Sequence, residues 1–355
     1  MRTERYLTFL AGHIPGSIET FRMGYFIIDE DRCLNYNYKS TECHNCRNSC
    51  PRGCWDETGQ TLPERCNSCG LCLSVCPVDA IGVEGLPVSA WKEATERTEG
   101  TLHLSCRRYG TGPWSCLGFL NARDLVALAW PTAVQGRDVY VYSSNCQECR
   151  APVSESLERE MARANRFLAR LGSGRVLQGE QPPVSEKENM AMDRRSFFTS
   201  LFSTGVETAR NVMWPEADAA PLPKARWRSE VLQGRSGVEL VENQEVFPTL
   251  EIAPGCIACA LCAKICPMQA ISGIENETGV ELWHAPLLCT GCGLCIAHCP
   301  VNAITLASEG KAVKQLLRTA EFPHCNECGQ PFKPAGQQLT CFECLLKGRQ
   351  SIFGP

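Results

Sequence analysis

The sequence lacks the long apolar run that a membrane-spanning helix requires. No window approaches the roughly 18 to 20 consecutive apolar residues of a span, and Met1–Leu10 has two arginines without a following apolar stretch. We therefore expect neither a membrane span nor a secretory signal peptide. The formal net charge of -4 also gives no electrostatic case for binding nucleic acid or an anionic membrane.

Motifs for nucleotide binding and for substrate chemistry are also missing. There is no G-x-G-x-x-G fingerprint and no P-loop, and Gly172–Gly174 is typical of a helix-ending turn. No paired carboxylates or nucleophile motif indicate a substrate pocket. The six histidines are scattered, with His44, His298 and His324 beside cysteines. We expect them to be surface or supporting residues, and we expect no catalytic residue in this chain.

Cysteine, by contrast, is abundant. The chain has 25 cysteines, and spacing alone sorts all but Cys54 into six sets of four. Three runs read C-x2-C-x2-C-x3-C-P, and they are Cys66–Pro77, Cys256–Pro267 and Cys289–Pro300. A fourth, looser run has Cys33, Cys43, Cys46 and Cys50, with Ser40 where the first ligand should be. Disulfide frameworks belong to small secreted scaffolds, so we expect reduced thiols in a cytoplasmic, low-oxygen setting.

These runs resemble the ligand runs of bacterial two-cluster ferredoxins, in which the fourth cysteine of each run binds the other cluster. The resemblance implies four [4Fe-4S] clusters with ligands assigned crosswise. In the C-terminal pair the implied sets are Cys256, Cys259, Cys262 and Cys299, and Cys289, Cys292, Cys295 and Cys266. In the N-terminal pair they are Cys66, Cys69, Cys72 and Cys50, and Cys33, Cys43, Cys46 and Cys76.

The last of these sets leaves an alternative for its first ligand. Either Cys33 reaches in across a longer loop, or Cys54 substitutes for it. Cys54 occupies the position that alanine takes after Cys76, Cys266 and Cys299. A buried cysteine serves readily as a small hydrophobic residue, so we favour Cys33 as the ligand and Cys54 as a packing residue.

A further set lies between the two cluster pairs and consists of Cys106, Cys116, Cys146 and Cys149. Residues 139–146 are typical of a strand that delivers a ligand at its C-terminal end. This part resembles the small delta subunit of methyl-viologen-reducing hydrogenases and thioredoxin-like ferredoxins, which implies a [2Fe-2S] cluster. Zinc or free thiols are alternatives. A redox pair at Cys146 and Cys149 is another, although such pairs normally sit at the start of a helix.

The sixth set, at the C-terminal end, consists of Cys325, Cys328, Cys341 and Cys344. Two C-x2-C knuckles separated by 12 residues suit tetrahedral zinc, and Gly329 allows the tight turn after Cys328. The segment resembles a zinc ribbon. Rubredoxin-type iron would use the same ligands, so iron is the alternative metal.

The expected fold is an α+β multidomain chain in which two ferredoxin-like modules flank a small α/β domain. The expected bounds are 28–90 and 246–307 for the modules, 98–180 for the α/β domain and 320–347 for the zinc-ribbon-like knuckle. Within 98–180 the pattern predicts strands at 102–105 and 138–142, and helices that begin after Asn121 and at Ser154. Residues 181–245 are expected to be a proline-rich linker with an amphipathic helix near 198–206. The Arg194-Arg195 pair in this linker resembles a twin-arginine export motif, but it lies too far inside the chain to act as one.

The expected function is electron transfer within a larger anaerobic oxidoreductase complex. By resemblance, hydrogenase, formate dehydrogenase, heterodisulfide-reductase-like and bifurcating complexes use such subunits, and the expected partners are redox protein subunits. Two alternatives stay open. The chain could be an assembly or partner-binding protein whose clusters are structural, or an autonomous reductase with an open coordination position on one cluster.

Overall fold

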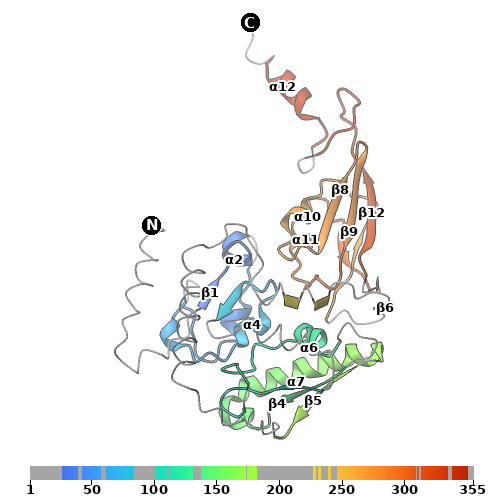
Figure 1. Cartoon of the computed structure of the whole chain (residues 1–355). Coiled ribbons are helices and arrows are strands. Elements are labelled where there is room, and N and C mark those ends of the chain that lie inside the picture. The colour runs from blue at the N-terminus through green and yellow to red at the C-terminus, as the bar shows by residue number, and fades with distance from the viewer. Residues whose placement is uncertain are drawn as a thin grey trace, which may run out of the picture.

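In the computed structural model, structure is described for most of the chain (Figure 1). The described residues are 26–38, 42–56, 61–83, 101–110, 112–130, 137–172, 174–181, 227–228, 231–232, 239–240, 246–308, 310–311, 313–334 and 338–350. The expected linker helix near 198–206, the Arg194-Arg195 pair and Ser40 lie outside these ranges.

The N-terminal module is closed by its first and last strands. Strand β1 (Phe26–Ile28) pairs antiparallel with β2 (Ile81–Val83), with Ile28 opposite Ile81. Between them lie short helices that each begin beside a cysteine run, namely α2 (Leu34–Asn37), α3 (Asn45–Asn48), the 3-10 helix η2 (Pro63–Arg65) and α4 (Leu71–Val75). Buried Leu34, Leu71 and Val78 form part of its core. The elements are too short to be stable alone, so the module depends on this core and on its cysteine sets.

The middle domain is a parallel sheet with the strand order β3-β4-β5. Its strands are β3 (Leu102–Leu104), β4 (Asp138–Tyr142) and β5 (Arg175–Gly179). Strand β4 matches the predicted range, and Val139 and Val141 alternate into the core. The predicted first helix is present as α6 (Ala122–Ala129), where Asn121 and Asp124 form a reciprocal capping box.

The second helix of this domain, α7 (Cys146–Leu171), begins eight residues earlier than the sequence pattern indicates. Arg150 is non-helical (φ -158°, ψ 83°), and Pro152 cannot donate a helical hydrogen bond. The kink separates a first turn that carries Cys146 and Cys149 from the long amphipathic part. Gly172 ends the helix in the left-handed region, as expected.

The C-terminal module repeats the closure of the N-terminal one, with β7 (Leu250–Ile252) antiparallel to β10 (Ile304–Leu306). Helices α10 (Leu261–Ile265) and α11 (Leu294–Ala297) each begin just after the second cysteine of a run. An antiparallel sheet in the order β12-β9-β8 extends beside them and was not predicted. Its strands are β8 (Ile271–Glu275), β9 (Gly279–His284) and β12 (Gln315–Glu321). The short strands β6 (Glu239–Leu240) and β11 (Gly310–Lys311) pair with each other.

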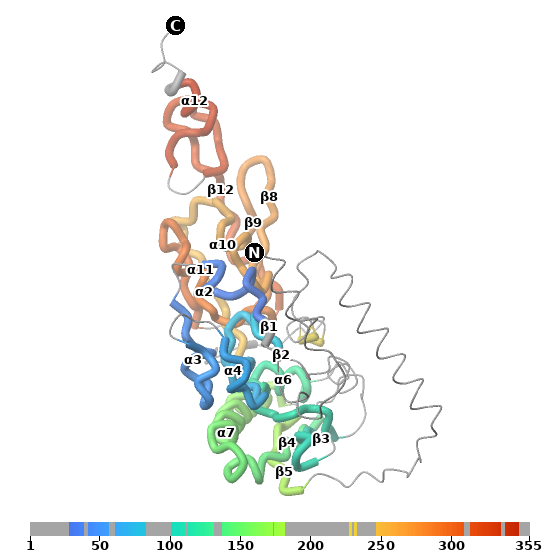
Figure 2. Tube along the Cα trace, turned by 90° about the vertical axis from the view of Figure 1, so that its left-hand side faces the viewer, coloured from blue at the N-terminus to red at the C-terminus, as the bar shows by residue number. Residues whose placement is uncertain are grey.

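The units follow one another along the molecule (Figure 2). The middle domain lies at one end, followed by the N-terminal module, the C-terminal module and, at the far end, the segment with α12 (Phe342–Gln350). None of the described helices combines the length and the apolar character that crossing a bilayer requires.

One linker residue joins the N-terminal module to the middle domain. Arg228 is 3% exposed, and its Nη1 donates to Asp124 Oδ1 of α6 at 2.9 Å while its Nη2 pairs with Asp79. Burial alone would lower the pKa of Arg228, but the two carboxylates outweigh it and raise the pKa, so the guanidinium stays charged. This buried triad couples the two units electrostatically.

Candidate iron–sulfur and metal centres

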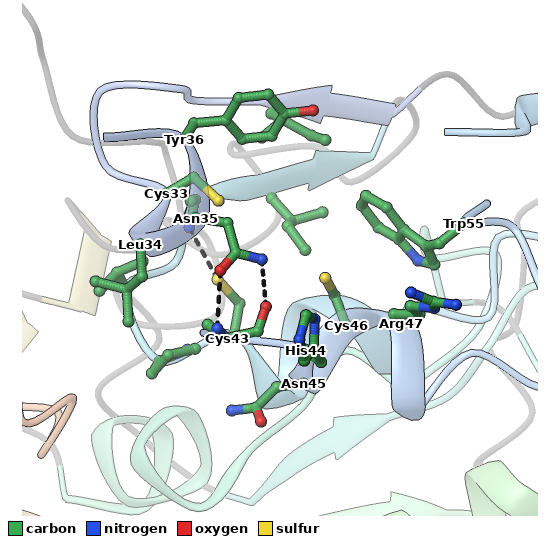
Figure 3. Close-up of a pocket in the computed structure, with 16 residues that line it drawn as sticks. Cys33, Leu34, Asn35, Tyr36, Cys43, His44, Asn45, Cys46, Arg47 and Trp55 are labelled. Atoms are coloured by element: carbon green, nitrogen blue, oxygen red, sulfur yellow. Dashed lines mark hydrogen bonds between the residues drawn. The ribbon is translucent and has the colours of Figure 1, made fainter. Parts of the chain in front are cut away.

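Three cysteines of the irregular run and one of the regular run line one cavity of about 210 Å³ in the N-terminal module (Figure 3). Those lining it are Cys33, Cys43, Cys46 and Cys76. Burial, together with the neighbouring thiols, raises the pKa of Cys46 to about 12. A bound metal cation would favour the thiolate form of Cys46, and four convergent thiols are the ligands that a soft metal centre requires.

Asn35 holds the long loop of this set closed. Its side-chain Oδ1 accepts a hydrogen bond from Cys43 N at 2.8 Å, and its Nδ2 donates to Cys43 O (Figure 3). The amide therefore pairs with the backbone as a neighbouring strand would, and it brings Cys33 next to Cys43 despite the ten-residue step. Sequence reasoning missed Asn35, because no spacing rule marks an asparagine that binds a remote backbone.

Cys54 lies in the position that the aligned runs assign to alanine. Its backbone N–H donates to Cys50 Sγ at 3.4 Å. The same i to i+4 hydrogen bond joins Ala80 to Cys76, Ala270 to Cys266 and Ala303 to Cys299. The Cys54 side chain is 1% exposed, and burial raises its pKa to about 12. Cys54 does not line the cavity of Figure 3, whereas Cys33 does.

The second N-terminal set gathers around Cys72. Burial raises the pKa of this thiol, and Cys69, Cys66 and Cys50, its expected co-ligands, raise it further. Cys46 of the neighbouring set also contributes to the shift. The two N-terminal sets therefore lie side by side.

The C-terminal module brings its cysteines together in the crosswise pattern. One pocket is lined by Cys266, Cys289, Cys292 and Cys295. In the other set, burial and the thiols of Cys256, Cys259 and Cys299 raise the pKa of Cys262 to about 12. Cys295 also interacts with Cys262, so these two sets are neighbours as well.

The backbone around the runs fits cluster binding. Residues with a left-handed backbone recur at equivalent positions of the cysteine runs. One position is two residues after the first cysteine of a run, and the other is three residues after its last cysteine. They are Ser68, Ala258 and Gly291 at the first position, and Gly53, Asp79, Gln269 and Asn302 at the second. Such turns aim successive N–H groups inward, and Ser68 N donates to Cys66 Sγ at 3.3 Å. Left-handed conformations are costly for alanine, so their retention at Ala258 indicates a constrained site.

The middle set combines two parts of its domain. Cys106 and Cys116 follow β3, while Cys146 and Cys149 lie in the first turn of α7. Burial and the thiols of Cys116, Cys106 and Cys149 raise the pKa of Cys146 to about 12. Arg108 Nη1 also donates to Cys149 Sγ at 3.3 Å.

Cys146 is the first residue of a helix, which is where redox-active cysteine pairs normally lie. Reactive pairs, however, have a lowered thiol pKa, whereas the pKa of Cys146 is raised. Four converging cysteines also exceed what a pair needs. The arrangement therefore favours a four-ligand centre.

The middle set is packed directly against the N-terminal module. A Cβ on Gly118 would lie 2.3 Å from Cys69 O, and one on Gly70 would lie 2.8 Å from Phe119 N. Arg150 Nη2 donates to Asn67 O at 2.9 Å. Burial is the main cause of the raised pKa of Cys69, and the nearby Cys116 thiol raises that pKa further. The two cysteine sets are thus held as neighbours by backbone contacts.

We expect Gly118→Ala to force these backbones apart. Overpacking of this kind costs about 1–3 kcal/mol of unfolding free energy, and anaerobic thermal unfolding measures it. Gly255→Ala is the matched control, because a Cβ there meets nothing within 4 Å. Equal stability of the two variants would show that the contact between Gly118 and Cys69 is not tight in solution.

The C-terminal cysteines form a different kind of site. The four Sγ atoms of Cys325, Cys328, Cys341 and Cys344 all lie within 4.8 Å of one another. Tetrahedral Zn–S bonds of about 2.3 Å place sulfurs about 3.8 Å apart, and Cys328 Sγ and Cys341 Sγ are 3.8 Å apart. Backbone N–H groups of Cys341 and Cys328 lower the pKa of Cys325 to about 6. This set fits one metal ion.

Comparison with known proteins agrees with this geometry. A 4Fe-4S dicluster domain matches residues 249–306, and a 4Fe-4S binding domain matches residues 61–82. A ferredoxin of Methanothermococcus thermolithotrophicus is 36% identical over 61 residues, which are 16% of this chain and 93% of the relative. The chain belongs to the 4Fe-4S ferredoxin family.

A second relative is by name an enzyme subunit. Pyruvate synthase subunit PorD of Methanothermobacter marburgensis is 36% identical over 69 residues, which are 19% of this chain and 73% of the relative. The expectation of ferredoxin-type 4Fe-4S domains is therefore confirmed. The individual ligand sets, the middle centre and the C-terminal metal stay predictions.

Proposed function

We propose that this chain is a multi-cluster electron-transfer subunit of a larger oxidoreductase complex. The N- and C-terminal sets would hold four [4Fe-4S] clusters, and the middle set would hold a [2Fe-2S] cluster. When bound, each cluster supplies a one-electron redox couple. The protein surrounds these centres with buried thiols and backbone N–H groups, which set where in the wide potential range of such clusters each one lies.

The observation that carries this proposal is the adjacency of the cysteine sets. Cys116 interacts with Cys69, and Cys72 with Cys46, so the middle set and both N-terminal sets follow one another in space. Cys295 interacts with Cys262 in the C-terminal module. One series of neighbouring sets across the middle domain and the N-terminal module, and a second within the C-terminal module, suit conduction of electrons to and from partners. Isolated structural clusters would not need it.

The proposed partners are redox protein subunits. PorD is by name a subunit of pyruvate synthase, and we extend subunit status, though not that enzyme, to this chain. At the C-terminal knuckle we propose a structural zinc ion that holds the two C-x2-C turns together. Rubredoxin-type iron is the alternative that metal analysis distinguishes.

The first prediction concerns metal content. Anaerobically purified, fully reconstituted protein should contain about 18 iron atoms and about one zinc per chain. Elemental analysis with protein quantified by amino-acid analysis measures both. Clearly fewer than about 16 iron atoms would remove at least one of the four cubanes from the proposal.

The second prediction tests conduction. The purified chain should accept several electrons reversibly at low potential and pass them to a redox partner, without turning over hydrogen, formate or NAD(P)H alone. In the native complex, Cys259→Ala should abolish electron flow between subunits and leave the partner's half-reaction with an artificial dye intact. Clusters that do not titrate would favour the assembly role, and substrate turnover by the chain alone would favour an autonomous reductase.

A further inference from the structure

The segment around Cys33 contacts the segment around Cys266 in the other module. Arg32, just before Cys33, donates from Nη2 to Pro267 O at 3.3 Å and to Met268 Sδ at 3.1 Å. Tyr38, just beyond α2, donates from its hydroxyl to Ile265 O at 3.0 Å. The residues that flank one cysteine therefore bind the residues that flank the other.

The irregular spacing of the N-terminal run supplies these contacts. In the three regular runs the first cysteine stands three residues before the second, whereas Cys33 stands ten before Cys43. Of the additional residues, Leu34–Asn37 form α2 and Tyr38 caps its C-terminal end. The Tyr38 ring also lies 6.0 Å from the His298 ring, edge to face. A run with regular C-x2-C spacing would lack these additional residues and therefore the Tyr38 contacts with the C-terminal module.

The guanidinium of Arg32 is buried at this contact. Arg32 is 9% exposed, and its Nε and Nη1 have no hydrogen-bond partner among the described residues. Burying a cation is costly unless negative charge lies close by. Asp79 and Asp29 supply part of that charge, and the Cys76 thiol also interacts with the guanidinium, whereas the Arg228 cation opposes them. Four thiolates per set would supply more once ionised and bound to metal.

We propose that the irregular Cys33 loop is the electron junction between the two ferredoxin modules. It would place the set of Cys33, Cys43, Cys46 and Cys76 next to the set of Cys266, Cys289, Cys292 and Cys295. With clusters held by these two sets, single electrons would pass between them, one centre being oxidised as the other is reduced, with no proton or co-reactant. Arg32 is a positioning residue whose fixed charge favours the reduced, more negative form of both centres. This inference rests on the proposed function.

Paired ligand variants of the full-length chain test the adjacency. Cys69→Ser with Cys259→Ser removes the outer centre of each module and leaves the two junction centres. Cys43→Ser with Cys292→Ser does the reverse. Both variants also carry Cys106→Ser, which removes the middle centre, because the middle set neighbours the Cys69 set and would broaden its signal. After full anaerobic reduction, the first variant should show spin–spin broadening in its electron paramagnetic resonance spectrum, and the second should show none. Independent signals in the first, or broadening in the second, would overturn the junction.

Arg32→Met provides a test that leaves every cysteine in place. Removing the charge should shift the midpoint potentials of two [4Fe-4S] centres to more negative values, with iron content unchanged. Arg175→Met is the matched control, because Arg175 is an exposed arginine paired with Asp138 on the middle domain. Unshifted potentials in Arg32→Met would contradict the proposal. If the cysteine variants lose all their iron, Arg32→Met is the decisive test.

The two failures can be told apart. If no centre is reducible in the unmodified chain, the proposed function fails. If the centres titrate normally but the junction pair shows neither coupling nor an Arg32-dependent shift, the function stands and only the junction fails.

Discussion

Cys33→Ser should remove one cubane, about four iron atoms per chain, while Cys54→Ala should leave the iron content nearly unchanged. Cys33 lines the cavity shared with Cys43, Cys46 and Cys76, so its loss opens one coordination position. Cys54 fills an alanine position and hydrogen-bonds through its backbone, which alanine preserves. Iron analysis and low-temperature electron paramagnetic resonance of the two variants measure the difference.

The reverse outcome has a definite meaning. Iron loss in Cys54→Ala with full iron in Cys33→Ser would make Cys54 the ligand and leave Cys33 in an entry loop. Cys54→Ser is a useful third variant, because it tests whether a polar group is tolerated at a position that is 1% exposed.

Arg228→Met should destabilise the chain by about 3–5 kcal/mol, because it leaves the carboxylates of Asp79 and Asp124 buried without their cation. The effect should appear as earlier anaerobic thermal unfolding and as faster proteolysis between the N-terminal module and the middle domain. Arg175→Met removes an exposed ion pair instead, and we expect a loss of at most about 1 kcal/mol.

Similar small losses in both variants would mean that water reaches the triad. A charge-neutral triple variant, Arg228→Met with Asp79→Asn and Asp124→Asn, separates the two causes. It should recover part of the stability if uncompensated charge is the problem, because the buried carboxylates are then gone.

The spacing of the cysteines predicts how they group, because metal chemistry dictates ligand spacing locally, and the assignment of individual ligands stays a prediction. Each set converges in space, and Asn121 caps α6 as its side chain suggested. The early start of α7 was missed, since Pro152 and the non-helical Arg150 interrupt the pattern there. A signal for the β8–β9 turn did exist, because Asn276 precedes Gly279 and its Oδ1 accepts from Gly279 N at 2.7 Å.

Contacts between units could not be predicted in this way. Arg32 reaches Met268 across 236 positions, and Arg228 reaches Asp79 across 149. Neither pair belongs to a periodic pattern or to a motif, and their partners are decided by how whole units dock. The irregular spacing before Cys43 is visible in the sequence, but by itself it indicates only an unusual ligand loop and not a contact between modules.

The triad of Arg228 also bears on how the chain is made. A ribosome synthesises Asp79 and Asp124 well before Arg228, which follows Asp124 by 104 residues. Until then the ion pairs of Arg228 with these two carboxylates cannot form across the face between the N-terminal module and the middle domain. We therefore expect the ion pairs across this face to form only after the first cysteines have left the ribosome. Maturation of the N-terminal centres and locking of that face are separated in time by the order of translation.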